Sequence, residues 1–238
     1  MNLEELRRLA AKEEMSLNFI AKDEMLSKLL VILKGFDDLV LKGGTAVNRV
    51  YINKKRFSED IDFDLIFKGS VKEALGRTKE IVSVIKGFEI QRPRIMHSTI
   101  RYDLIYTNPL GHKDKVRLEF RVTKKAGKYS KKIVNWGFVP GESSLLNVYD
   151  IEELIKSKIE CVLDRLEGKD FLDLYYLMEI PHKHVKRINK DKLIERINLE
   201  EKEMKSVINA VNHYIPRNLR PADWTEFLEE LKKKIEGY

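Results

Sequence analysis

The stretch D-I-D-F-D-L at residues 60–65 constrains the fold more than any other part of the sequence. Asp60, Asp62 and Asp64 occupy every second position, and large apolar side chains fill the positions between them. Successive side chains of a β-strand point to opposite faces, so this period of two predicts a strand. One face of that strand would carry three carboxylates, and the other would pack into a hydrophobic core.

The acidic face of this strand needs a physical reason, because three like charges repel one another and no cation is interleaved with them. A charged edge strand can resist aggregation, but lysines or mixed charges would serve that purpose at lower cost. A divalent cation relieves the repulsion, and Mg²⁺ prefers oxygen ligands. An EF-hand calcium loop also begins D-x-D-x-D, but Leu65 and Val71 stand where that loop requires Gly and Glu. We therefore predict a catalytic magnesium site.

Composition narrows the class of protein. Lys and Arg outnumber Asp and Glu by 45 to 38 among the 238 residues, a net charge of +7 that suits a phosphate-bearing partner without proving one. The single cysteine, Cys161, excludes an internal disulfide and a multi-cysteine zinc site. No run of about 18 apolar residues occurs, and the first residues are charged with a helical pattern. We therefore expect a cytoplasmic protein without a membrane span.

The succession of hydrophobic patterns predicts an α+β fold in two parts. The elements that we expect are helices within 3–33, strands at 39–41 and 60–67, a helix at 71–86, strands at 88–95, 99–107 and 115–123, and helices at 150–166 and 170–180 followed by two or three more. The character of the chain changes after the Pro- and Ser-containing stretch 140–144. We predict a domain with a mixed β-sheet flanked by helices at 1–144 and an all-helical domain at 145–238.

A second motif, LKGGTAV at residues 41–47, lies a short distance before the acidic strand. Gly43 and Gly44 after an apolar strand allow the backbone to approach a bulky anion, and a helix that starts immediately afterwards adds the positive end of its dipole. Gly-Gly-Thr alone is a weak signal that favours an ordinary turn, and neither a P-loop nor a G-x-G-x-x-G motif is present. Together with the acidic strand, it predicts a phosphate-binding loop opposite metal-binding carboxylates.

At this point the sequence resembles a known family. KGGTAVNRVY followed by RFSEDIDF is similar to the signature of the AbiEii-type nucleotidyltransferase toxins, a branch of the DNA polymerase β-like nucleotidyltransferase superfamily. IAKDEMLSKLL is similar to the helix before that loop, and ELIKSKIECVLDRLEGKDFLDLYYL resembles the second conserved block. The resemblance covers about residues 16–180, with the motifs in the same order and at similar spacing.

The resemblance implies a set of site residues. This chain departs from the family pattern at Lys169, which replaces the arginine that is usual before Asp170 and so removes a bidentate donor. Without the resemblance, Lys158 would be read as a solvated lysine, and Asp170 would be read equally well as a helix N-cap. The implied residues are Lys42, Gly43, Gly44, Thr45 and Lys158 for nucleotide binding; Ser58, Asp60, Asp62, Lys158, Asp170 and Asp173 for catalysis; and Asp60 and Asp62 as metal ligands.

The superfamily adds a third carboxylate from a later strand, and Glu119 is our candidate. The stretch KVRLEFRV at 115–122 alternates, which places Glu119 on a polar face with Arg117 and Arg121. An ordinary ion pair with these arginines is the alternative interpretation, and Asp64 and Asp103 are the competing carboxylates. We prefer Glu119 because Asp64 lies at the far end of the acidic strand.

A lysine-rich stretch, KKAGKYSKK at 124–132, is predicted to form the tip of a hairpin. It is either a solvated turn or a surface that contacts the phosphates of RNA. In the second interpretation, Lys124, Lys125, Lys131 and Lys132 would bind RNA.

The expected function is that of a magnesium-dependent nucleotidyltransferase, with two metal ions and an NTP as co-substrate. The resemblance implies a toxin that transfers NMP to an RNA acceptor, a tRNA 3′ end, and that is restrained by a cognate antitoxin protein. Three alternatives stay open: transfer to a protein hydroxyl, transfer to a small molecule as in antibiotic modification, and an inactive binding module of the same fold. An acidic pocket for a cationic substrate would indicate the small-molecule enzyme, whereas this chain is basic.

Overall fold

The computed structural model describes residues 1–183, 185 and 188–238. At its centre is a mixed sheet with the strand order β3-β5-β6-β2-β1-β8-β7, and β4 pairs with β5 beside this path. The strands are β1 (Leu39–Lys42), β2 (Asp60–Ile66), β3 (Glu89–Ile90), β4 (Arg94–Met96), β5 (Thr99–Thr107), β6 (Lys113–Thr123), β7 (Tyr129–Val134) and β8 (Ser144–Tyr149). The α+β class and the mixed sheet are as predicted.

The strands predicted at 39–41, 60–67, 99–107 and 115–123 are confirmed as β1, β2, β5 and β6. The stretch predicted as one strand at 88–95 is divided between two short strands, β3 and β4, which both pair with β5. In β2 the apolar side chains between the aspartates are all fully buried, so the strand separates an acidic face from a core face as its alternation predicts.

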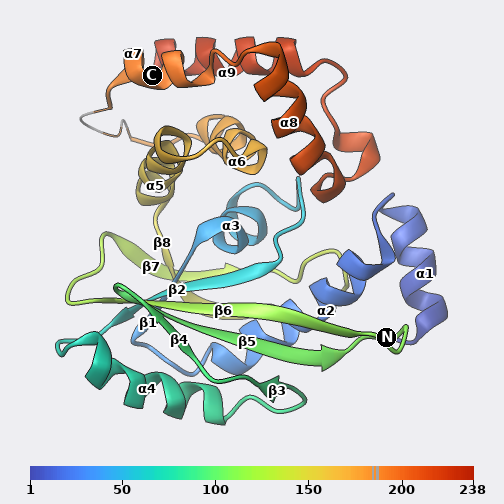
Figure 1. Cartoon of the computed structure of the whole chain (residues 1–238), viewed down its shortest axis with the longest axis vertical. Coiled ribbons are helices and arrows are strands. Elements are labelled where there is room, and N and C mark those ends of the chain that lie inside the picture. Colours follow the sequence, from blue (N-terminus) through green and yellow to red (C-terminus); the bar gives the residue numbers. More distant parts are fainter. Residues whose placement is uncertain (184, 186–187) are drawn as a thin grey trace.

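Helices lie on both sides of the sheet (Figure 1). Helix α2 contacts β6, and α4 contacts β5 and β6, whereas α3 lies against β2 and is continued by η1, which contacts α6. Figure 1 shows α5 and α6 above α3, α7 and α9 above them, and α8 running down beside α6. The helices are α1 (Leu3–Lys12), α2 (Leu17–Leu33), α3 (Gly43–Ala46), η1 (Val47–Tyr51), α4 (Val71–Ser83), α5 (Ile151–Asp164), α6 (Gly168–Met178), α7 (Lys190–Ile197), α8 (Glu201–Val211), η2 (Asn212–Tyr214), η3 (Arg217–Leu219) and α9 (Trp224–Gly237).

The predicted boundary at residue 144 is wrong in one respect, because residues 145–149 are not helical. They form β8, which pairs with β1 on one side and β7 on the other, so helical structure begins at Ile151. The sequence SLLNVY does not alternate apolar with polar side chains, and it follows the stretch 140–144 at which we placed the start of the helical domain. Buried side chains of the sheet and of the C-terminal helices, such as Phe63 and Phe171, belong to one continuous core.

The predicted hairpin at 124–132 is also wrong. Strand β6 lies beside β2 and β5, whereas β7 pairs with β8 at the edge of the sheet. The chain between them therefore passes from one part of the sheet to another instead of turning back on its neighbour. Local turn residues do not reveal such a crossover, because strand order depends on long-range pairing.

Among the described residues, we find no helix that is long and apolar enough to cross a membrane.

Candidate active site

The loop after β1 brings the backbone against the acidic strand. Gly43 has a φ of +68°, a conformation that favours glycine, and a Cβ at this position would lie 2.3 Å from Asp62 Oδ2. A Cβ on Gly44 would lie 2.5 Å from Arg56 Nη2 and 2.9 Å from Ser58 Oγ. Both glycines, Ser58 and Asp62 line one cavity. The loop therefore has the close backbone approach that its two glycines predict.

Thr45 lies behind the glycine loop. Helix α3 begins at Gly43, earlier than expected, and Thr45 is fully buried in it. The Thr45 hydroxyl donates to the backbone carbonyl of Asp60 and lies 3.1 Å from Ser58 Oγ. Thr45 is not among the residues that line the cavity. It therefore fastens the glycine loop to β2, and its contact with nucleotide stays a prediction.

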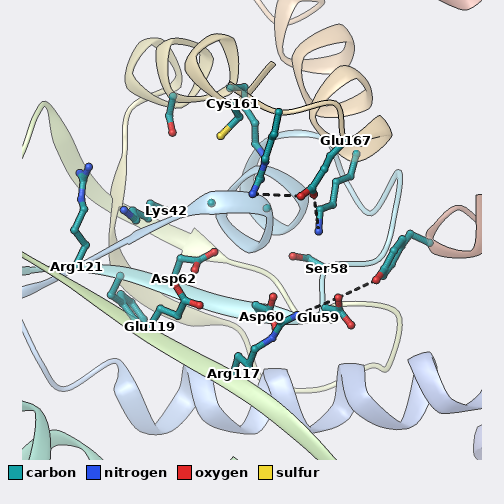
Figure 2. A pocket seen from close by; sticks show the side chains of 18 of the residues that line it. Lys42, Ser58, Glu59, Asp60, Asp62, Arg117, Glu119, Arg121, Cys161 and Glu167 are labelled. Carbon is teal, nitrogen blue, oxygen red and sulfur yellow. Dashed lines mark hydrogen bonds and ion pairs between the residues drawn. The ribbon is translucent and has the colours of Figure 1, made fainter. Parts of the chain in front are cut away.

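The neighbouring strands bring Asp62 and Glu119 together. Strands β2 and β6 are parallel, and their register places Asp62 beside Glu119. Burial, with Glu119 and Asp60 nearby, raises the pKa of Asp62 to about 6. Glu119 Oε1 accepts a hydrogen bond of 2.7 Å from Arg101 Nε on β5. Figure 2 shows the Asp62 and Glu119 side chains close together in the cavity, so Glu119 has the position that a third carboxylate requires.

Asp60 faces the same cavity and is held by Arg117. Arg117 Nε donates to Asp60 Oδ1 at 2.8 Å, and Arg117 Nη2 donates to Glu59 Oε1 at 3.3 Å. Burial raises the pKa of Asp60, and the charge of Arg117 offsets this only in part. The Tyr214 hydroxyl also donates to Glu59, at 2.8 Å. Through Tyr214, the segment after α8 therefore supplies part of the cavity wall.

The carboxylates fit a divalent cation in kind and in charge. Asp62 has no hydrogen-bond or ion-pair partner among the described residues, although the site holds it partly buried beside Glu119 and Asp60. A cation would remove the repulsion that raises its pKa. However, Asp60 and Glu119 are engaged by arginines, and the described part of the chain contains no group of three His, Cys, Asp or Glu side chains that could hold a metal ion as they stand. Metal ligation by Asp60, Asp62 and Glu119 therefore stays a prediction.

Asp64, the third aspartate of the strand, is neutralised by the protein itself. It is fully buried, accepts hydrogen bonds from Arg121 and Tyr149, and lies 2.9 Å from Lys42 Nζ. Burial raises its pKa, but Arg121 and Lys42 outweigh this effect and hold the pKa below the usual value. The ammonium of Lys42 is thus used by Asp64, although Lys42 lines the cavity. Its predicted contact with nucleotide stays a prediction.

Asp103, the other rival for Glu119, lies on β5 outside the cavity-lining set. One of its oxygens accepts from Arg94 and from Lys115, each at 3.0 Å. The register of β5 and β6 pairs Asp103 with Arg117, two residues away from the position opposite Glu119. Of the three candidate acids, Glu119 is therefore the one that lies beside Asp62.

A buried ionic network connects the cavity to the C-terminal helices. Lys158 Nζ on α5 lies 2.7 Å from Asp170 Oδ1 and 2.7 Å from Asp173 Oδ2, both on α6. Arg56 donates to both oxygens of Asp173, at 2.7 and 2.6 Å, and Arg165 Nε donates to Asp170 at 2.9 Å. The spacing i, i+3 places both carboxylates on one face of α6.

This network gives the aspartates of α6 an indirect role. Asp170 and Asp173 are fully buried and do not line the cavity, whereas Lys158, Arg56 and Arg165 do. Burial lowers the pKa of Lys158, but Asp173 and Asp170 outweigh it and raise the pKa, so Lys158 stays charged. The two aspartates therefore position cations that face the cavity. Direct participation of Asp170 and Asp173 in catalysis stays a prediction.

The cavity has a volume of about 420 Å³ and lies between the sheet and the helices α5 and α6 (Figure 2). Asp64, Asp170 and Asp173 do not line the cavity but pair with five of its cations, so the cavity presents cationic donors for a polyphosphate without a net excess of charge. Eight cationic and five acidic residues line the cavity. These residues are Lys42, Arg56, Arg101, Arg117, Arg121, Lys158, Arg165 and Lys169, and Glu59, Asp60, Asp62, Glu119 and Glu167.

Several of these cavity residues were missed in the sequence. Arg56 is adjacent to the acidic motif, but only its contact with Asp173, 117 positions later, shows its role. Arg117 and Arg121 share the polar face of β6 with Glu119, so strand alternation was a signal for both. Arg101 is revealed only by the pairing of β5 with β6.

The four lysines predicted to bind RNA are not in the cavity. Lys131 lies 3.0 Å from Asp37 and Lys132 lies 3.2 Å from Asp150. Lys124 and Lys125 are exposed, and within the described part of the chain they form no ion pair. RNA binding by these residues stays a prediction. Lys131 and Lys132 are less available for it than Lys124 and Lys125, because their ammonium groups already have acidic partners.

Comparison with known proteins decides the family. The model of the family described as "Nucleotidyl transferase AbiEii toxin, Type IV TA system" matches residues 24–236, which is most of the chain. This chain belongs to the AbiEii family. The resemblance seen in the sequence motifs is thereby confirmed, and the match extends beyond residue 180 into the C-terminal helices. AbiEii proteins are nucleotidyltransferase toxins of toxin–antitoxin systems, as the family description states. No curated protein matches the chain significantly.

Solved structures agree with membership of the AbiEii family in fold. MenT4, a nucleotidyltransferase toxin from Mycobacterium tuberculosis, superposes with a TM-score of 0.63 at 15% identity, over 99% of this chain and 88% of that one. JHP933 from Helicobacter pylori has a TM-score of 0.58 at 23% identity, over 93% of this chain and 92% of that one. At these identities the likeness establishes a shared fold only.

Proposed function

We propose that this protein is a magnesium-dependent nucleotidyltransferase toxin that transfers NMP from an NTP to the 3′ end of a tRNA and is restrained by a cognate antitoxin protein. The observation that carries the proposal is the environment of Asp62. It is a carboxylate without a partner among the described residues, beside Glu119, in a cavity whose wall carries eight cationic side chains. Membership of the AbiEii family supports the toxin role and the antitoxin partner.

The triphosphate has two groups of ligands in this proposal. The backbone at Gly43 and Gly44 is free of side chains and lies against Asp62 and Ser58, which allows phosphate oxygens to approach closely. Lys158 uses two contacts for Asp170 and Asp173, and an ammonium has three N–H donors. Its remaining donor, on the cavity side, is available for a phosphate oxygen.

Asp60, Asp62 and Glu119 would hold two Mg²⁺ ions. When bound, these ions would supply charge neutralisation at the phosphates and would favour ionisation of the acceptor hydroxyl. Arg117 donates a hydrogen bond to Asp60, and Arg101 donates one to Glu119. Both arginines would give up these bonds when Mg²⁺ binds and would remain close enough to contact the anionic substrate.

The transfer forms one P–O bond and breaks another. The acceptor oxygen attacks the α-phosphorus and loses its proton to solvent, while the bond from that phosphorus to the α–β bridging oxygen breaks and pyrophosphate leaves with the electron pair of that bond. Lys158 and Arg165 face the cavity from α5 and its C-terminal end, where they would stabilise negative charge on the departing phosphates. The buried aspartates of α6 hold Lys158 in place for this task.

The acceptor is tested directly by label transfer. We expect purified protein with Mg²⁺ and an α-³²P-labelled NTP to label tRNA, with the product lengthened on a denaturing gel. Each of the four NTPs is assayed separately with tRNA, total protein and an aminoglycoside as acceptors. Label in protein or in the small molecule alone would reject the RNA acceptor and retain the transferase, whereas no label in any acceptor would reject the transferase.

The phosphate loop gives a second prediction. We expect Gly44→Val to weaken binding of a non-hydrolysable NTP at least tenfold, because a side chain there would collide with Arg56 and Ser58 and fill the approach to the backbone. Isothermal titration calorimetry measures this affinity. The matched control is Gly76→Ala in α4, where a Cβ meets nothing within 4 Å. If Gly44→Val binds the NTP as the wild type does, the loop is an ordinary turn.

A further inference from the structure

A second cavity, of about 670 Å³, lies between the end of α1 and the segment that follows α8. Its positive side chains are Arg7, Arg217, Arg220 and, when protonated, His213, against a single acid, Glu14. We refer to this cavity as the arginine groove. The segment after α8 comes close to α1 on one side of the molecule (Figure 1). Its lining residues come from both ends of the sequence, so only the fold brings these charges together.

The arginines of the groove differ from those of the catalytic cavity. In the catalytic cavity, Arg56 and Arg117 each have carboxylate partners within hydrogen-bond distance. In the groove, none of Arg7, Arg217 and Arg220 forms an ion pair with any described residue, and Arg220 donates only to a backbone carbonyl. Guanidinium groups without acidic partners are available to bind phosphate oxygens, and bidentate geometry suits them to that ligand.

Aromatic rings connect the groove to the catalytic cavity. His213 lines the groove and is exposed, and Tyr214 lines the catalytic cavity. Their ring centroids lie 4.0 Å apart, and Phe19 stacks against both, at 5.7 Å from His213 and 5.2 Å from Tyr214. The two sites are therefore separated by stacked rings rather than by a thick layer of protein. An exposed ring at this position can stack on a base.

From this arrangement we infer that the arginine groove binds the single-stranded RNA segment that precedes the acceptor 3′ end. The inference rests on the proposed RNA acceptor and adds the surface along which it lies. Phosphates would contact Arg7, Arg217 and Arg220, and a base would stack on His213, so that the strand enters the catalytic cavity past Tyr214. An acidic protein segment would use the arginines but has no need of the exposed ring, which favours RNA as the occupant.

The test measures binding of a fluorescently labelled 12-nucleotide single-stranded RNA and of total tRNA by anisotropy at several salt concentrations, without NTP. We expect the double substitution Arg7→Gln, Arg217→Gln to weaken RNA binding about tenfold at low salt and to reduce the slope of log affinity against log salt by about one to two. The matched control, Lys86→Gln with Arg92→Gln, removes two exposed charges that have no ion pair among the described residues and lie outside the groove. It should leave the slope unchanged.

A second pair of variants tests the ring. His213→Ala should weaken RNA binding about fivefold or more, and His213→Phe should restore it, because a phenyl ring keeps the stacking surface. An unchanged salt slope in the arginine variant, or an equal change in the control, would overturn the inference. So would normal RNA binding together with loss of antitoxin binding, which would assign the groove to an acidic protein. The binding assay does not depend on transfer. If the protein binds RNA through the groove but transfers no label in the separate transfer assay, only the proposed function is rejected.

Discussion

Asp62→Asn is expected to reduce NMP transfer at least a hundredfold. The amide keeps the size of the side chain but loses the charge that a divalent cation needs, and the loss of one metal ligand removes several kcal/mol of transition-state stabilisation. Transfer is measured from a labelled NTP at saturating Mg²⁺. The control is Glu89→Gln on β3, an exposed acid with an ion pair to Lys113 outside the cavity, which should leave the rate unchanged.

The same substitution is expected to stabilise the fold at neutral pH. The pKa of Asp62 is raised from 3.8 to about 6, so the native state binds this proton more tightly than the unfolded chain does. Ionised Asp62 therefore destabilises the fold. This destabilisation is fully present above pH 6 and disappears as the pH falls toward 4. A difference of about two pKa units corresponds to roughly 3 kcal/mol.

Thermal unfolding without Mg²⁺ checks this sign. At pH 7.5 we expect Asp62→Asn to melt about 5–10 °C above the wild type, and at pH 4 we expect the two proteins to melt together. Added Mg²⁺ should raise the melting temperature of the wild type and leave the variant unaffected. An Asp62→Asn variant that transfers NMP at the wild-type rate would refute the assignment of Asp62 as a metal ligand. Equal melting temperatures at pH 7.5 would refute the claim that ionised Asp62 destabilises the fold.

Asp173→Ala is expected to destabilise the protein by about 3–5 kcal/mol. Asp173 is fully buried and accepts two hydrogen bonds from Arg56 and a contact from Lys158. Its removal leaves two buried cations short of a partner, and breaking a buried ion pair from one side costs about this much. Urea unfolding monitored by circular dichroism measures the change in the free energy of unfolding.

The matched control is Glu167→Ala. Glu167 also pairs with two cations, Arg165 at 3.5 Å and Lys169 at 3.1 Å, but all three side chains are partly exposed. Ion pairs of this kind contribute about 1 kcal/mol or less. A loss of transfer in Asp173→Ala at unchanged stability would contradict the positioning role and assign Asp173 directly to catalysis.

The local motifs were readable from the sequence because their geometry is set by near neighbours. The alternation in β2 placed Asp60 and Asp62 on one face, and the glycines at 43 and 44 indicated a close backbone approach; both features are present in the structure. The same alternation in β6 selected Glu119. The family resemblance also came from such local blocks, and the family match confirms it.

Contacts between distant segments could not be read in this way. Asp170 resembled an N-cap or a catalytic acid, but its charge is used by Lys158 and Arg165, and Asp173 is used by Arg56. Strand β8 was assigned to the helical part, since its pairing with β1 joins residues more than 100 positions apart and local sequence does not reveal such a pairing.

By itself, the sequence determined which residues can carry the chemistry: a strand with an acidic face, a glycine loop and a lysine in a helix. Only the tertiary structure decided which charges are free. Asp64 and Asp62 are two positions apart and chemically identical, yet Asp64 is neutralised by Arg121 and Lys42 while Asp62 has no partner among the described residues. The physical reason is that the energy of a charge depends on its burial and on its neighbours in space, which the pairing of distant strands and helices supplies.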